Sequence, residues 1–197
     1  MLHLKTFIKD IALKNNKNGK VIIGGASLGG ALAMITAVEC PELVEKVVLI
    51  DAQGFIDGKG PSDISDNLAI FGVNVLKSWP LRMLANLLSY KDLKFATFDA
   101  MRCGRLHCLS PSWEKASVNF LKSGGFIVSD KVPLVMQETL VIWGKDDNIL
   151  EANTPQLFKE TLPNLKEFYF IDNCGHVPHL EKPNETKEKI LNFLGDL

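Results

Sequence analysis

Three short motifs hold the residues of this chain that could do chemistry together. Ser27 lies in a G-x-S-x-G pentapeptide (25–29), Asp147 ends the segment W-G-K-D-D (143–147), and His176 follows a glycine. A serine hydroxyl is a poor nucleophile at neutral pH unless a base takes its proton. Histidine does this best when a carboxylate fixes its tautomer. The order serine, acid, histidine therefore indicates nucleophilic attack on a carbonyl carbon.

The serine motif also has the form of a sharp turn between a strand and a helix. An apolar run, Val21 to Ile23, enters glycines on both sides of Ser27, and an alanine-rich segment follows. This pattern fits a nucleophile elbow, which holds the hydroxyl above the end of a sheet. We expect the missing Cβ atoms of Gly25 and Gly29 to let strand and helix approach closely. A phosphate loop and a dinucleotide fingerprint do not fit, because this glycine-rich loop lacks the lysine of the first and the G-x-G spacing of the second.

Composition excludes several classes of protein. The chain has 197 residues, 46% hydrophobic and 23% charged, with a formal net charge of −1. This suffices for one core with an insertion, and it predicts no partnership with nucleic acid and no transmembrane segment. The four scattered cysteines predict free thiols in a reducing compartment, hence an intracellular, cytoplasmic protein. Location in an organelle such as a plastid would require a targeting segment upstream of Met1.

Alternating strands and helices predict an α/β fold with a mostly parallel sheet. Strands are expected at 20–24, 47–50, 139–143 and 167–171, and helices at 2–15, 28–39, 155–161 and 184–194. Such sheets bind ligands beyond the carboxyl ends of their strands. Ser27, Asp51, Asp147 and His176 all fall at or shortly after predicted strand ends, so we expect them on one rim of the sheet.

A helical insertion is predicted between the second and third of these strands, because Gly, Pro, Ser and Asp clusters separate its helical segments. The segments are expected at 63–78, 81–90, 92–106, 112–122 and 126–136. Their apolar residues are expected to form helix core, among them Phe71, Val75, Leu84, Leu88, Phe95 and Phe98. The predicted organisation is a first core part at residues 1–54, the insertion at 55–137 and a second core part at 138–197.

The chain resembles the C-terminal two thirds or so of an α/β-hydrolase. In the capped serine hydrolase branch, which includes esterases and carbon–carbon bond hydrolases, the acid motif W-G-x-x-D is matched at 143–147. The histidine motif is matched by Gly175, His176, Glu181 and Pro183. The resemblance implies a partial α/β-hydrolase fold with a helical cap inserted between the sixth and seventh strands. It also implies a catalytic triad of Ser27, Asp147 and His176, with the backbone N–H of Leu28 as an oxyanion donor.

The activity implied by this resemblance is hydrolysis of a small ester or related carbonyl substrate through an acyl-enzyme. No cofactor and no metal are expected. Asp51 is an alternative acid, since some lipases of this fold take the acid from the sixth strand, but Asp147 carries the family motif. Two groups suggest a metal weakly: His176 with His179, and His107 with Cys103 and Cys108. Each lacks further ligands of suitable spacing.

The resemblance also predicts what this chain lacks. The family places further strands and a glycine-rich oxyanion loop before the elbow, and only 26 residues precede Ser27. A second hypothesis is therefore a truncated, catalytically impaired protein that acts as a binding or interaction module. The strand at 20–24 would then be an exposed apolar edge, and we expect self-association through it and weak turnover from residues 1–197 alone.

Overall fold

The computed structural model describes residues 2–14, 19–56, 64–125 and 127–195. Its centre is a parallel sheet of four strands in the order β1-β2-β3-β4. The strands are β1 (Val21–Ala26), β2 (Val44–Ile50), β3 (Glu138–Gly144) and β4 (Leu165–Ile171). The expected α/β class with a parallel sheet is confirmed, and each expected strand is present, longer by one to three residues than the sequence indicated.

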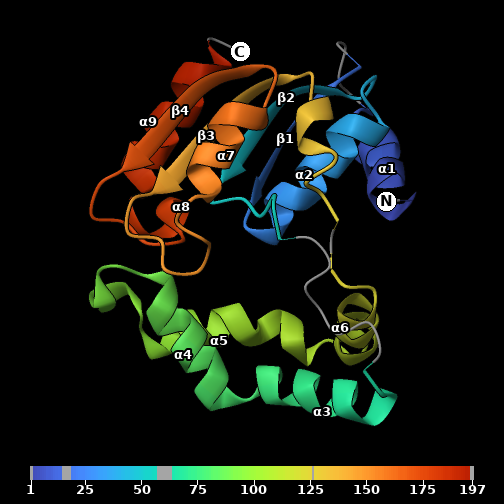
Figure 1. The fold of residues 1–197 in the computed structure, drawn as a ribbon, viewed down its shortest axis with the longest axis vertical. Helices are drawn as coiled ribbons and strands as arrows, with labels where there is room; N and C mark the ends of the chain where they lie inside the picture. The colour runs from blue at the N-terminus through green and yellow to red at the C-terminus, as the bar shows by residue number, and fades with distance from the viewer. Residues whose placement is uncertain (1, 15–18, 57–63, 126, 196–197) are drawn as a thin grey trace.

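The sheet separates two apolar layers, one on each face (Figure 1). On one face α2 and α7 pack against alternate residues of the central strands, such as Val47, Leu49 and Val141. On the other face α9 packs against the intervening residues, such as Val48 and Leu140. Both central strands are buried on both sides, which explains their continuous runs of Val, Ile and Leu.

The helices of the sheet region follow the sequence prediction closely. They are α1 (Leu2–Phe7), the π-helix η1 (Ile8–Ala12), α2 (Leu28–Glu39), α7 (Thr154–Thr161), α8 (Pro178–Glu181) and α9 (Pro183–Leu194). The sequence prediction did not include the single turn α8. The apolar residues of the N-terminal helical segment are only partly buried: Ile8 packs against Cys40 and Leu43, but Phe7 and Ile11 are 55% and 62% exposed.

The helical insertion lies between β2 and β3 in the chain, and its helices α3 to α6 lie beyond the carboxyl ends of the strands in space (Figure 1). Its last part differs, because Val128, Val132 and Val135 pack into the core beside the sheet. Within the insertion α3 packs against α6, and α4 packs against α5. Its elements are α3 (Asp66–Lys77), α4 (Trp79–Ser89), η2 (Leu93–Phe95), α5 (Phe98–Arg105), η3 (Leu106–Leu109), α6 (Trp113–Lys122) and η4 (Val132–Leu134). The described part of the segment expected at 126–136 contains the short 3-10 turn η4 and no α-helix, and the start of the segment expected at 63–78 lies outside the described residues.

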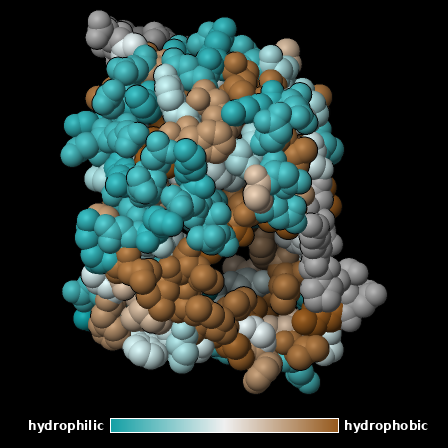
Figure 2. Space-filling view, turned by 60° about the vertical axis from the view of Figure 1, so that its left-hand side comes forward, coloured by the Kyte–Doolittle hydropathy of each residue, from teal (hydrophilic) through white to brown (hydrophobic). Residues whose placement is uncertain are grey.

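The expectation that the apolar residues of the insertion form helix core is wrong for most of them. Phe71, Leu84 and Phe98 are 66%, 51% and 50% exposed, and Val75 and Leu88 are also exposed. Figure 2 shows the hydrophobic residues gathered on this lower part of the molecule, with a hollow between it and the sheet region. Although α3 packs against α6 and α4 against α5, many apolar side chains of these helices remain at the surface.

Candidate active site

Ser27 sits on a strained turn between β1 and α2. Its backbone has φ 50° and ψ −122°, a conformation that residues other than glycine rarely adopt. Hydrogen bonds hold the turn against the end of β2: the Ser27 N–H donates to the carbonyls of Ile50 and Asp51, each at 3.1 Å. The Ser27 carbonyl in turn accepts from the N–H groups of Gly30 and Gln53, each at 3.0 Å. The surrounding structure thus fixes the strain that a nucleophile elbow requires.

The close approach at this turn depends on Gly25 and Gly30. A Cβ added at Gly25 would lie 2.1 Å from the carbonyl oxygen of Gly29, and one at Gly30 would lie 2.3 Å from the Cβ of Ala52. The expectation for Gly29 is wrong, because a Cβ there would meet nothing within 4 Å. Leu28 opens α2, and the first N–H groups of a helix have no acceptor within the helix. The Leu28 N–H is therefore available to an oxygen bound beside Ser27.

Asp147 and His176 form a buried hydrogen-bonded pair in the loops after β3 and β4. The distance from His176 Nδ1 to Asp147 Oδ2 is 2.9 Å, and the two side chains are 8% and 3% exposed. Asp147 Oδ1 accepts from the backbone N–H groups of Ile149 at 2.7 Å and Leu150 at 3.3 Å. Burial raises the pKa of Asp147. The hydrogen bond and charge of His176 and the two backbone N–H groups lower it, and together they outweigh burial, so the pKa lies below the ordinary value. The carboxylate can thus orient the imidazole and leave Nε2 toward solvent or substrate.

Asp51 lies beside this pair, at the end of β2. One ligand atom from each of Asp51, Asp147 and His176 lies within 4.8 Å of the other two. The Asp51 residue is fully buried and has a positive φ of 38°. Since its backbone carbonyl accepts from Ser27 N–H, the sequence-predicted residues Ser27, Asp51, Asp147 and His176 all gather at one rim of the sheet. No hydrogen bond joins the Ser27 hydroxyl to His176 among the described residues.

Glu181 connects the histidine loop to the helical insertion. Its buried carboxylate accepts hydrogen bonds from three backbone N–H groups, those of Gly175 (2.8 Å), Lys91 (3.1 Å) and Asp92 (2.7 Å). The His176 N–H donates to the carbonyl of Ser89, at 2.8 Å. The sequence contained the signal, since Glu181 matches a family motif, but only the fold reveals that its carboxylate joins two segments of the chain.

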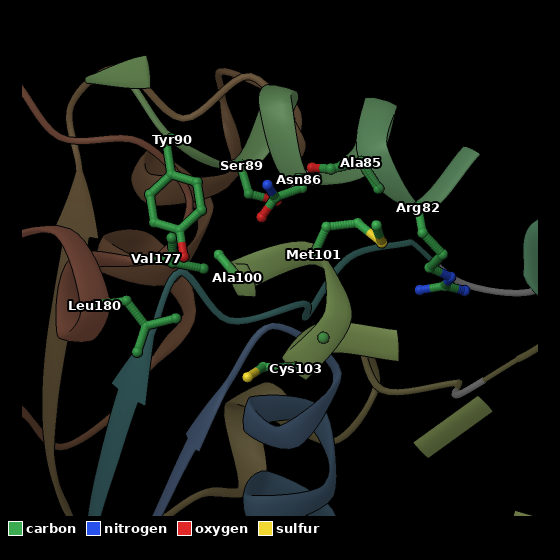
Figure 3. A pocket seen from close by; sticks show the side chains of 11 residues that line it. Arg82, Ala85, Asn86, Ser89, Tyr90, Ala100, Met101, Cys103, Val177 and Leu180 are labelled. Atoms are coloured by element: carbon green, nitrogen blue, oxygen red, sulfur yellow. Dashed lines mark hydrogen bonds between the residues drawn. The ribbon is translucent and has the colours of Figure 1, made fainter. Parts of the chain in front are cut away.

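A cavity of about 430 Å³ lies at this junction (Figure 3). Helices α4 and α5 of the insertion supply most of its wall, and Val177 and Leu180 supply the side next to His176. Arg82, Asn86, Ser89 and Tyr90 line it from α4 and its end, and Met101 and Cys103 line it from α5. The cavity is therefore mostly apolar, with a few polar groups, as small-molecule sites are.

The metal-binding alternatives find little support. Within the described part of the chain, the one trio of His, Cys, Asp or Glu close enough to share an ion is Asp51, Asp147 and His176. There Nδ1 of His176 already bonds to Asp147. His107 Nε2 lies 3.4 Å from Cys108 Sγ, but Cys103 does not complete a trio.

His179, the other histidine of the predicted pair with His176, is partly buried. Burial, and then the charge of His176, lower the pKa of His179. Its Nδ1 is buried without a hydrogen-bond partner among the described residues.

These observations define an α/β protein with a serine on a strained strand-to-helix turn and an aspartate–histidine pair at the neighbouring strand ends. Residues 1–183 match the model of the α/β hydrolase fold family. The chain belongs to this family.

Relatives show the range of proteins to which the chain is similar. It is 35% identical to the α/β hydrolase domain-containing protein VTE7 of Arabidopsis thaliana, over 88% of this chain and 53% of that protein. It is 24% identical to Lipase 1 of Psychrobacter immobilis, over 96% of this chain and 60% of the lipase. Among solved structures, a serine hydrolase involved in carbazole degradation, CarC, is 27% identical, with a TM-score of 0.69 over 98% of this chain and 68% of that one. The chain thus spans between half and two thirds of the length of these curated relatives.

No helix among the described residues is both long enough and apolar enough to cross a membrane. The cysteines at 40, 103, 108 and 174 are free thiols.

Proposed function

We propose that this chain carries the catalytic residues of a serine hydrolase that acts on a small ester or related carbonyl substrate. The observation that carries the proposal is the 2.9 Å bond from His176 Nδ1 to Asp147 Oδ2, at the same rim as the strained turn of Ser27. Membership in the α/β hydrolase fold family supports the class of reaction. The free thiols support the proposed cytoplasmic location.

The proposed reaction has two steps. In the first, His176 Nε2 takes the proton of Ser27, the serine oxygen attacks the carbonyl carbon, and the imidazolium returns the proton to the leaving group. The Leu28 N–H stabilises the oxyanion as one of the donors that such a site needs. In the second step His176 takes a proton from a water molecule, and the water oxygen attacks the acyl carbon. The bond from that carbon to Ser27 Oγ then breaks, the imidazolium returns its proton to Oγ, and the acid leaves. Asp147 holds Nδ1 protonated throughout and offsets the charge of the imidazolium.

The cavity between the insertion and α8 is the proposed place for the acyl or leaving group. It is adjacent to His176 through Val177, and its apolar wall suits an uncharged chain or ring. An ester and a carbon–carbon bond next to a carbonyl both suit this mechanism. Hydrolysis rates measured on aryl and glycerol esters and on a vinylogous 1,5-diketone acid would distinguish ester cleavage from carbon–carbon bond cleavage.

A fluorophosphonate probe tests the nucleophile directly, because it labels only an activated serine hydroxyl. We expect the full chain to be labelled, Ser27→Ala to lose all labelling, and Ser110→Ala, a change at an exposed serine of the insertion, to keep it. Mass spectrometry of the labelled peptide identifies the site. Labelling that survives Ser27→Ala would contradict the proposal.

A binding or interaction module is the second candidate, and the edge strand favours it. Strand β1 pairs with β2 on one side and with no described strand on the other. Beside it lies an apolar groove of about 390 Å³, lined by Ile22, Val48, Ile50, Ile190 and Leu194 among others. Such an edge is a template for pairing with another strand, including β1 of a second copy. Light scattering of the full chain and of Ile22→Lys tests this: a monomer at all concentrations would argue against self-association.

A further inference from the structure

Asp51 occupies a position that the proposed reaction does not use. It is a buried acid of a type that could serve as the triad acid, yet His176 bonds to Asp147. The hydrogen bonds of Asp51 show what its two oxygens do. Oδ1 accepts from the N–H of Gly144 at 2.9 Å, and Oδ2 has no hydrogen-bond partner among the described residues.

This asymmetry decides the protonation state. As a carboxylate, Asp51 would be a buried anion with one oxygen unsatisfied, next to the anion of Asp147, and both features are costly. As a carboxylic acid, the same Oδ2 carries a proton and becomes a donor. The Asp147 carboxylate is an acceptor in the same cluster, in which one atom from each residue lies within 4.8 Å of the others.

Asp147 has room for this bond. Its Oδ1 accepts from Ile149 and Leu150, and its Oδ2 bonds to His176 Nδ1. An ionised carboxylate offers about four acceptor sites, so one remains for an O–H donor. A donor on the third side would keep the carboxylate from rotating away from the imidazole.

We propose that Asp51 is a neutral carboxylic acid that donates its proton to Asp147 and thereby holds that carboxylate against His176. Asp51 is a positioning residue in this scheme, since it acts on the imidazole only through Asp147. The inference rests on the proposed role of Asp147 as the partner of His176.

The charges around Asp51 agree with this scheme. Burial, and then the charge and side-chain proximity of Asp147, raise the pKa of Asp51 to about 9, although the Gly144 N–H opposes the shift. The Cys174 thiol behind it also stays neutral, because burial, Glu181 and Asp51 raise its pKa to about 12. Among the described residues, His176 and Asp147, from the loops after β4 and β3, are the other titratable groups close to Asp51.

Titration by NMR tests the protonation state without any need for turnover. In the full chain labelled with ¹³C at aspartate carboxyls, the Asp51 signal is the one absent from Asp51→Asn. We expect it to titrate above about pH 7, well above an ordinary aspartate. A midpoint below about pH 7 would overturn the proposal. Because this measurement needs only a folded chain, it stays decisive even if the chain hydrolyses nothing.

Unfolding gives an independent measure of the same proton. Between the ordinary pKa of aspartate and a folded pKa of about 9, the folded state holds one proton more than the unfolded state. The free energy of unfolding of the wild type therefore falls as pH rises through this window. In Asp51→Asn this part of the slope is lost. Identical slopes in the two proteins would contradict a neutral Asp51.

The positioning role has its own readout, the rate at which a fluorophosphonate labels Ser27. Asparagine keeps a donor and an acceptor in the same shape, so Asp51→Asn should label within about threefold of the wild type and lose the decline that ionisation of Asp51 causes above about pH 9. Asp51→Ala removes the donor and should label about tenfold more slowly. If Asp51→Asn were as slow as Asp147→Asn, Asp51 would itself be the triad acid, and the proposal would fail.

Discussion

The sheet region and the helical insertion differ in how they are stabilised. Helix α2, beside the sheet, buries most of its residues, whereas α4 and α6 of the insertion bury none and α5 buries only Met101. The C-terminal end of the insertion, with Val128, Val132 and Val135, packs into the core beside the sheet. Near α4, the contacts with the histidine loop are polar: the Glu181 carboxylate accepts from Lys91 and Asp92, and the His176 N–H donates to Ser89.

The two regions therefore have different proposed roles: the strand ends hold the reacting groups, and the insertion forms most of the cavity wall. The proposed reacting groups stand at strand ends, where packing on both faces of the sheet fixes them. The cavity is walled mainly by the insertion, whose residues can change with little cost to the core. We expect substitutions near the strand ends to affect rate and stability strongly, and substitutions in the insertion to affect substrate choice.

The largest effect is expected at the strand-end acid. Asp147→Asn should misorient His176 and lower kcat by about 10³ to 10⁴, because the imidazole would then hold the wrong tautomer. Asp146→Asn, a change at the neighbouring acid that pairs with Lys91, is the control and should retain activity. Ester hydrolysis or fluorophosphonate labelling measures both. An equally large loss in Asp146→Asn would mean that disturbance of the loop after β3, and not the tautomer of His176, causes the loss.

A pair of leucines measures the contrast in stability. Leu140 is fully buried in β3, while Leu88 of α4 is 45% exposed. Leu140→Ala should lower the free energy of unfolding by about 2 to 5 kcal/mol, and Leu88→Ala by less than about 0.5 kcal/mol. Urea unfolding gives both values. Equal losses would show that the insertion is packed as tightly as the sheet region.

Glu181 joins the two regions, so it tests how far they depend on one another. Glu181→Gln replaces a charged acceptor of three backbone N–H groups by an amide with one oxygen. Since hydrogen bonds to charged groups contribute about 1.5 to 3 kcal/mol, we expect a loss of this size in the free energy of unfolding, with slower labelling of Ser27. Glu188→Gln, at an exposed glutamate of α9, should change neither. Unchanged labelling in Glu181→Gln would show that the hydrogen bonds between Glu181 and the insertion do not affect the reactivity of Ser27.

The smallest effect on rate is expected inside the cavity. Met101 is buried and lines it from α5, so Met101→Ala enlarges the space without touching the strand ends. We expect the ratio of kcat/KM between a long and a short acyl ester to rise about tenfold, with kcat on the preferred ester changed by less than about threefold. An unchanged ratio would place the acyl group elsewhere.

Much of this architecture could be predicted because it depends on neighbours in the chain. Runs of Val, Ile and Leu form the central strands, glycines around Ser27 allow the turn, and Pro41 follows the end of α2. These preferences act within a few residues, so the sequence predicts the order of strands and helices and offers Ser27, Asp147 and His176 as candidate site residues.

Other features depend on segments that are distant in sequence. The bond from the Gly144 N–H to Asp51 joins residues 93 positions apart, and that from Asp92 to Glu181 joins residues 89 apart. No local pattern indicates whether Asp51 is a rival of Asp147 or its neighbour. The exposure of Phe71 and Leu84 is likewise set by which layers exist to cover them. The sequence by itself determined the elements and the reactive residue types. The tertiary structure alone decided their partners, because burial, and with it the charge of a side chain, is a property of the assembled layers.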